Sequence, residues 1–265
     1  MNKFKLNIAS GTIFLAFATA ASSELSKPAC DYIEVYESIK GEGSFPDLVA
    51  HMAHDVEYCH LADGCDKGLK KRTSPIQITI DDGGSEKTRK LFNANAAYTI
   101  NLVNHLSGLE FYLDEHPETV TGVIHVILVG DSDESNQTSL VPEFFGKFLK
   151  SKKLTCLATN FDWPDAEIEY SEVWIKTSTS PMRLANCVKE EIFNASGVPG
   201  DPIGLDSLFS EDSLSGETFG PPIFQNFDAR PLIAMQLVYH NEMVNGQSPA
   251  RTKEVSQNVI NASCQ

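Results

Sequence analysis

The sequence predicts a single α+β domain. Its 265 residues contain segments with helical periodicity and segments with strand periodicity, interleaved irregularly and without a βαβ repeat. No internal repeat and no long low-complexity linker divides the chain. A chain of this length can form one large domain or two small ones, and the absence of a linker favours one.

The first predicted elements are a helix and a strand. Residues 46–59 carry apolar side chains at helical spacing, which predicts a helix. These side chains are Leu48, Val49, Met52, Ala53 and Val56. Residues 75–80 alternate in the strand period and end at Asp-Asp-Gly-Gly over residues 81–84, a strong turn signal.

The strongest helix signal covers residues 85–105. Ser85 can cap its first turn, and Gly108 ends it. Its apolar face consists of Leu91, Ala94, Tyr98, Leu102 and Leu106. Residues 109–113 and 123–129 are predicted strands, and the second is apolar enough for the centre of a sheet.

The second half of the chain predicts further helices and one strand. Residues 141–149 form a short helix and residues 168–175 a strand. Residues 181–196 form a helix, ended by Gly197, with one apolar stripe of Leu184, Cys187, Val188 and Ile192. We expect an ordered loop over 198–222, a helix over 229–243 and a polar tail after Gly246, with a short helix before Cys264.

The first residues predict a cleavable signal peptide. Lys3 and Lys5 precede an apolar stretch over residues 8–20, which ends in the small residues Ala18-Thr19-Ala20. This stretch is too short for a membrane span, which needs roughly 20 apolar residues. No later segment has the length and apolarity of a span. We therefore expect a periplasmic or secreted protein whose mature chain begins near Ala21.

The charge is strongly acidic, with a formal net charge of −15. This excess argues against binding of nucleic acids, because phosphate backbones are bound by Lys and Arg. It favours a cationic ligand or partner. The local basic cluster at residues 67–72 is predicted to be solvated surface.

The six cysteines predict disulfides, because an even number in an exported chain is typical of paired thiols. They are Cys30, Cys59, Cys65, Cys156, Cys187 and Cys264. Fifteen connectivities are possible for six cysteines, and the sequence alone does not select one. The short spacing favours Cys59–Cys65 weakly.

Four stretches of the chain resemble the bacterial exported family called domain of unknown function 2927. They are residues 45–78, with Lys-Arg-Thr-Ser-Pro before the strand, residues 99–111, residues 187–201 and residues 206–212. The third contains Cys-Val-Lys-Glu-Glu-Ile-Phe-Asn, where the family has Cys-x-His-Glu-Glu-Leu-x-Gln. The positions that match the family motifs are Cys187, Lys189, Glu190, Glu191, Asn194, Gly197, Asp201, Phe209 and Asp212.

The resemblance implies domain boundaries and one disulfide. It places a family domain at residues 45–245. A signal peptide at 1–20 and an extension at 21–44 precede this domain, and a tail at 246–265 follows it. The family usually has another cysteine before the strand that precedes its signature, which favours the pair Cys156–Cys187.

The family is similar to the zincin metallopeptidases in its strand–helix–strands–helix order. The resemblance implies a twisted mixed sheet backed by the helix at 85–107, with a second helix at 181–196 that carries the motif. A zincin helix carries His-Glu-x-x-His, with two histidines as zinc ligands and the glutamate as general base. Here Lys189 and Phe193 occupy the histidine positions, and neither can bind zinc. The motif is therefore degenerate.

Glu190 and Glu191 are the remaining catalytic candidates. Two carboxylates can serve as acid and base when their environments separate their pKa values. Adjacent helical residues point about 100° apart, so the two would not face one substrate. We expect solvated or capping roles for both.

Other candidate sites are weaker. His51 and His54 are three residues apart, could share a helical face and bind a metal, and lie near His60. Residues 131–136 resemble a calcium loop but lack its glycine, and Pro142 replaces its last acid. Residues 201–212 could also bind calcium or mark a functional surface, with Tyr239 and His240 facing it. No cofactor is predicted.

These observations predict a non-catalytic, exported binding or envelope-associated protein on a degenerate metallopeptidase-like scaffold. One alternative is a hydrolase that uses Glu190 without a zinc site. A second is a secreted, disulfide-stabilised module for protein interactions. An acidic face around Glu190 would favour a cationic ligand.

Overall fold

The computed structural model describes ten segments of the chain. They are residues 24–39, 43–54, 68–80, 85–113, 123–130, 142–151, 154–162, 167–178, 180–200 and 229–265. The predicted signal peptide lies outside these segments. No helix in the described part of the chain is both long enough and apolar enough to span a membrane.

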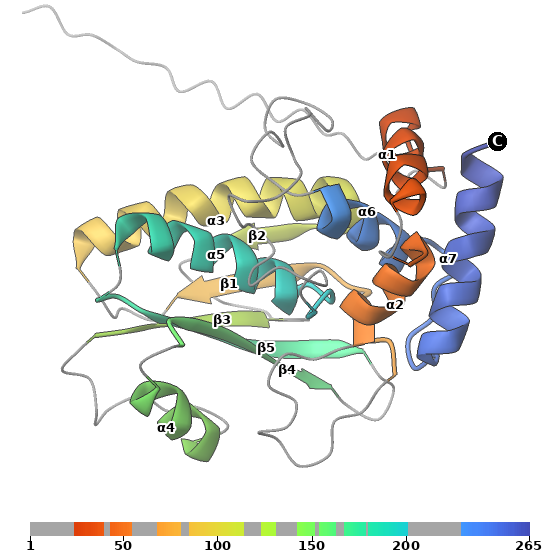
Figure 1. The fold of residues 1–265 in the computed structure, drawn as a ribbon. Helices are drawn as coiled ribbons and strands as arrows, with labels where there is room; N and C mark the ends of the chain where they lie inside the picture. Colours follow the sequence, from red (N-terminus) through yellow and green to blue (C-terminus); the bar gives the residue numbers. More distant parts are fainter. Residues whose placement is uncertain are drawn as a thin grey trace, which may run out of the picture.

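A five-stranded mixed sheet forms the centre of the molecule (Figure 1). The strand order is β2-β1-β3-β5-β4, and only the edge strand β4 runs antiparallel to its neighbour. The strands are β1 (Ile76–Ile80), β2 (Phe111–Leu113), β3 (Val123–Val129), β4 (Cys156–Asp162) and β5 (Ile168–Lys176). The predicted mixed sheet and α+β class are confirmed, although β1, the following helix and β2 form one parallel βαβ unit.

The central strand β3 is apolar on both faces because both faces are covered. Its residues Ile124 and Val126 pack into the larger hydrophobic cluster, whereas Ile127 and Val129 pack into a smaller one on the opposite face. Helices α3 (Glu86–Ser107) and α5 (Pro181–Ala195) cover the first face, and α4 (Pro142–Lys150) covers part of the second (Figure 1).

Helix α3 has the ends that its sequence predicts. The Ser85 hydroxyl accepts a hydrogen bond from the Thr88 amide, and Gly108 closes the helix in a left-handed conformation at φ 69°. Its long apolar face packs against α5 and the sheet.

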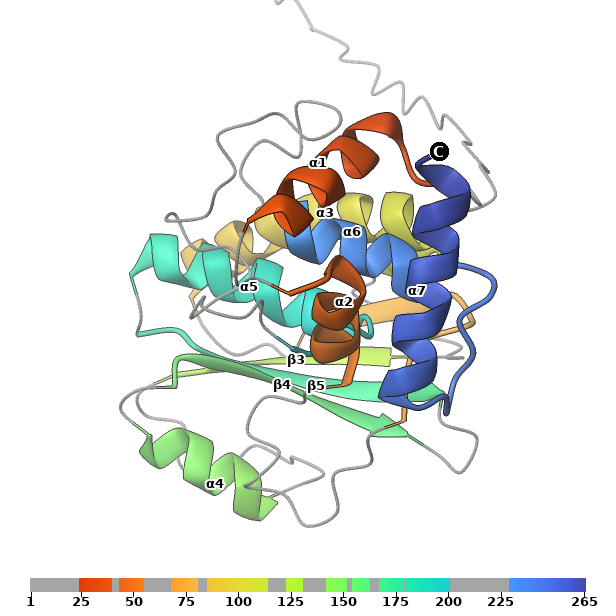
Figure 2. The same ribbon diagram turned by 45° about the vertical axis from the view of Figure 1, so that its right-hand side comes forward.

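Four further helices lie at one end of the sheet (Figure 2). They are α1 (Lys27–Ser38), α2 (Phe45–His54), α6 (Ala229–Val238) and α7 (Pro249–Ser263). The sequence did not predict α1 or the full length of α7, and α6 ends five residues earlier than expected. Buried residues of all four helices join the larger hydrophobic cluster.

Two disulfides join distant parts of the chain. Cys156–Cys187 confirms the pair that the resemblance favours, and Cys30–Cys264 joins α1 to the end of α7. Cys59 and Cys65 lie outside the described residues. Disulfides fit an extracellular or periplasmic protein.

Candidate functional site

Helix α5 carries the positions that match the family signature. Ser180 caps its first turn through the Arg183 amide, and Pro181 starts it, as is common at this position. Leu184 and Val188 face the core, and the disulfide from Cys187 fixes the middle of the helix to β4. These contacts hold α5 against the edge of the sheet formed by β4 and β5.

The two degenerate ligand positions take part in packing. The Lys189 ammonium lies 5.8 Å from the centre of the Tyr98 ring on α3, a cation–π contact. Partial burial lowers the pKa of Lys189 from its usual value. Phe193 is 0% exposed and belongs to the larger hydrophobic cluster. Both side chains therefore contribute to the packing of α5.

The two glutamates have different environments. Glu191 is only 4% exposed, so the expectation that it is solvated is wrong. The reason is helical spacing, since Glu191 follows the buried Leu184 by seven residues and therefore lies on the same stripe. Glu190 is half-buried, at the border of that stripe.

Asn194 lies between the two glutamates on the helix surface. It is about 40° from Glu190 and about 60° from Glu191 around the helix axis, at the spacing of an α-helix. Asn194 is 5% exposed, and its main-chain carbonyl accepts a hydrogen bond from Asn160 on β4 at 3.2 Å. Its Oδ1 atom is buried and has no hydrogen-bond partner among the described residues. Among the described residues, this amide oxygen is therefore a buried polar group whose hydrogen bond the fold does not supply.

A buried arginine fixes the end of α5 to the sheet. Arg72 is 1% exposed, so the prediction of a solvated cluster at residues 67–72 is wrong at this position. Its guanidinium bonds to the ends of α5, β3 and β5 through four main-chain carbonyls and one hydroxyl. The acceptors belong to Ala195, Val123, Ile168, Glu169 and Ser171.

Tyr239, the residue directly after α6, extends this network. Its hydroxyl accepts a hydrogen bond from the Arg72 amide and donates one to the Ser196 carbonyl. Burial raises the pKa of Tyr239, so the hydroxyl stays protonated. Tyr239 was expected beside the loop at residues 201–212, which lies outside the described residues together with Asp201, Phe209 and Asp212.

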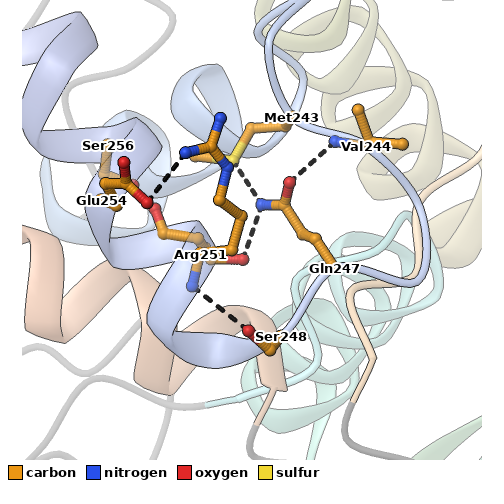
Figure 3. Close-up of polar contacts among 8 residues, drawn as sticks. Met243, Val244, Gln247, Ser248, Arg251, Glu254 and Ser256 are labelled. Carbon is orange, nitrogen blue, oxygen red and sulfur yellow. Dashed lines mark hydrogen bonds and ion pairs between the residues drawn. The ribbon is translucent and has the colours of Figure 1, made fainter.

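The histidine pair does not form a metal site with other described residues. His54 is 8% exposed, and its Nε2 atom lies 2.8 Å from the Thr252 hydroxyl on α7. The same hydroxyl accepts from Gln247, whose own Oε1 accepts from the Val244 amide (Figure 3). Within the described segments, no three His, Cys, Asp or Glu side chains are grouped to hold a metal ion. His60 and the candidate loop at 131–136 lie outside these segments.

A polar row that the sequence analysis did not single out lies on the second face of the sheet. One cross-strand row consists of Thr79, His125, Glu172 and Thr159, from β1, β3, β5 and β4. Glu172 is buried and accepts a hydrogen bond from Trp174 at 3.1 Å. His125 lies 3.1 Å from the Tyr170 hydroxyl. Polar residues alternating within the predicted strands were the available signal.

Comparison with known families identifies the chain. The family model described as Protein of unknown function (DUF2927) matches residues 49–258. The chain belongs to this family. A search of the curated proteins finds no match. Membership of the DUF2927 family covers the sheet, α5 and most of α7, and by itself it assigns no activity.

Proposed function

We propose that this DUF2927 protein is an exported, non-catalytic binding protein built on a degenerate metallopeptidase-like scaffold. One observation carries the proposal. At the two positions where a zincin has its histidines, Lys189 contacts an aromatic ring of α3 and Phe193 fills the core. A helix that uses these two side chains for packing is a structural element. Its exposed side can still form a binding surface.

The order of the elements supports the scaffold. A strand, a long helix, several strands and a second helix follow one another as β1, α3, β2 to β5, and α5, with the short helix α4 between β3 and β4. Fold similarity alone does not give a function, so the argument depends on the side chains of α5.

Export is supported by the predicted signal peptide and by the two disulfides. The acidic composition suits a cationic ligand. The alternative of a hydrolase that uses Glu190 has weaker support. An unaided catalytic carboxylate is typically strongly desolvated, whereas Glu190 is only half-buried.

Metal content tests the proposal. Mature protein is purified from periplasm without chelators, its N-terminus is sequenced, and bound metals are measured by mass spectrometry. We expect a start near Ala21 and far less than one equivalent of zinc or any other transition metal. A stoichiometric metal that is lost in His51→Ala/His54→Ala would contradict the proposal and indicate a metal-dependent enzyme.

Peptidase assays give an independent readout. We expect any trace hydrolysis of casein or synthetic peptides to be equal in wild type and Glu190→Gln. Hydrolysis that copurifies with the protein and disappears in Glu190→Gln would favour the hydrolase.

A further inference from the structure

The edge strand β4 has main-chain groups that are open to further pairing. The Lys176 amide donates to the Thr155 carbonyl at 2.9 Å, so these residues form a hydrogen-bonded pair of the antiparallel β4–β5 ladder. Such pairs alternate, so the N–H and C=O groups of Cys156, Ala158 and Asn160 point away from β5. In the described part of the chain, β4 has no strand neighbour on that side. We propose that β4 of a second copy of this chain pairs with this edge in the antiparallel direction.

The opposite edge of the sheet, at β2, is closed by a side chain. The Ile76 amide of β1 donates to the Glu110 carbonyl, so the main-chain groups of the next residue, Phe111, point away from β1. The Asn104 side chain of α3 takes both of them. Its Oδ1 accepts from the Phe111 amide at 2.7 Å, and its Nδ2 donates to the Phe111 carbonyl at 3.0 Å. At β2 the fold therefore supplies the partner that a neighbouring strand would supply.

Strand β4 lacks the usual protection of a sheet edge. Natural proteins block such edges with very short strands, Lys, Pro or bulges, because an unprotected edge pairs with other chains. The seven residues of β4 include neither Lys nor Pro, and its register is irregular only between Phe161 and Asp162, at its end. β4 is therefore the edge that the fold leaves available to another chain.

The side chains of β4 on the second face of the sheet are self-complementary about Thr159. Leu157 packs with the smaller hydrophobic cluster there, and the Phe161 ring lies 5.6 Å from the Tyr170 ring. When two copies pair with Thr159 opposite Thr159, Leu157 of each copy lies opposite Phe161 of the other. The Thr159 Oγ1 atom is buried and has no hydrogen-bond partner among the described residues, which needs an explanation. A cross-strand Thr–Thr hydrogen bond would supply the partner.

The same register matches the main chain and leaves room for the helices. Ala158 of each copy lies opposite Asn160 of the other, and both have outward N–H and C=O groups, so the two residues can exchange hydrogen bonds. Helix α5 contacts both β4 and β5. Because strands lie about 4.8 Å apart, two helices placed in this way would be roughly 10 Å apart, which is the distance of packed helices.

Charges at the two ends of β4 favour the antiparallel direction. The exposed Lys150 and the half-buried Lys176 lie near its start, where the Lys176 ammonium donates to the Ser151 carbonyl at 2.5 Å. Glu167 and the exposed Glu169 follow its end. Antiparallel pairing brings the basic end of each copy towards the acidic end of the other. The formal net charge of −15 opposes association, but physiological salt screens this repulsion beyond about 8 Å.

Sedimentation velocity of the mature, oxidised protein at physiological ionic strength tests the inference. We expect a concentration-dependent dimer. Ala158→Pro removes an N–H group that β5 does not use, so it should leave the circular dichroism unchanged and weaken the dimer by about ten- to a hundredfold. Thr159→Lys places two like charges opposite each other and should also give monomers. Tyr112→Lys on β2, where the side chain is 37% exposed, is the matched control and should leave the dimer intact.

Thr159→Cys tests the register and the identity of the partner. Opposite residues of a non-hydrogen-bonded pair have Cα atoms about 4.5 Å apart, within the range of a disulfide. On oxidation, Thr159→Cys should therefore form a covalent dimer on a non-reducing gel, whereas Tyr112→Cys should not.

Three results would overturn the inference. They are a wild-type protein that stays monomeric at all concentrations, a dimer of unchanged affinity in folded Ala158→Pro, and the absence of a covalent dimer in Thr159→Cys. The inference goes beyond the proposed binding function and is independent of it, because neither metal content nor hydrolysis enters the test.

Discussion

At the scale of single residues, Arg72 shows how a buried charge can be held mainly by main-chain carbonyls, with the nearby Glu167 carboxylate adding an electrostatic attraction. Its guanidinium bonds to main-chain carbonyls at the ends of α5, β3 and β5, and to the Ser171 hydroxyl. These dipoles replace the water that the cation loses on folding. Burial lowers the pKa of Arg72 to about 10, so it stays charged at neutral pH. The residue therefore joins three elements through one side chain.

Replacing Arg72 should destabilise the protein strongly. Arg72→Met leaves several buried carbonyls without a donor, which should cost about 3 kcal/mol or more in the free energy of unfolding. The exposed Arg183→Met on α5 is the control and should change it by less than about 0.5 kcal/mol. Urea denaturation of the oxidised protein, followed by circular dichroism, measures both. Equal stability of the two variants would show that the Arg72 network contributes little.

The sequence could not predict this burial. A basic cluster is usually solvated, and residues 67–72 show no apolar periodicity that argues otherwise. The groups that accept from Arg72 lie between 51 and 123 residues away in the chain. Only the folded arrangement brings these acceptors together. The burial of Glu191 was predictable in principle, because its place on the stripe of Leu184 follows from spacing alone.

Lys71 makes the stability of the protein change with pH in the alkaline range. Burial lowers the pKa of Lys71 to about 8 in the folded state, from 10.5. Between these values the unfolded chain binds more protons, so stability rises with pH, by at most about 1.4 kcal/mol per pH unit. Below pH 8 the full cost of burying the charge remains. Lys71→Met should abolish this rise, and unfolding curves from pH 7 to 10 measure it. A rise of equal size in the variant would assign it to other groups.

At the scale of elements, the end of α5 depends on a close approach between two segments. Gly197 follows α5 at φ 109°, a conformation that side chains rarely adopt. A Cβ atom there would lie 3.0 Å from the Lys70 carbonyl oxygen. The glycine therefore allows the segment before β1 to pass beside α5 and to place Arg72 under its last turn.

Gly197→Ala should cost about 1–3 kcal/mol, because both the backbone conformation and the contact become unfavourable. Gly146→Ala in α4 is the matched control, since nothing lies within 4 Å of its added Cβ. That change should stabilise the protein by about 0.5–1 kcal/mol through helix propensity. Thermal and urea denaturation compare the two. A neutral Gly197→Ala would mean that the two segments separate easily.

Predictability differed between elements for physical reasons. The sequence predicted β3, α3 and α5 because buried elements carry a continuous apolar run or a regular apolar stripe. It missed β4, an edge strand whose Thr159 and Asn160 interrupt any apolar pattern. It also underestimated α7, which buries only a few apolar side chains against α2. Such elements form because their neighbours are in place.

At the scale of the whole molecule, the two ends of the described chain close on each other. Cys30 and Cys264 are 234 residues apart in sequence, and their disulfide joins the start of α1 to the end of α7, where the two helices meet (Figure 2). The DUF2927 match covers residues 49–258, so both cysteines lie outside it. The disulfide therefore fastens α1 and the end of α7 onto the part of the fold that the family model matches.

Removing this disulfide should loosen the helical end while the sheet stays folded. In the chain-entropy model a loop of this length is worth about 5 kcal/mol, and measured losses fall between about 2 and 5 kcal/mol. We expect Cys30→Ser/Cys264→Ser to lower the free energy of unfolding within that range. Limited proteolysis should then cut first in α1, because its apolar contacts are few and its tether is lost. The other disulfide, Cys156–Cys187, closes a loop of sequence separation 31. Its loss in Cys156→Ser/Cys187→Ser should expose α5 instead. If both variants were cut first within the sheet, α1 and the end of α7 would unfold together with the sheet as one cooperative unit, which would contradict the prediction.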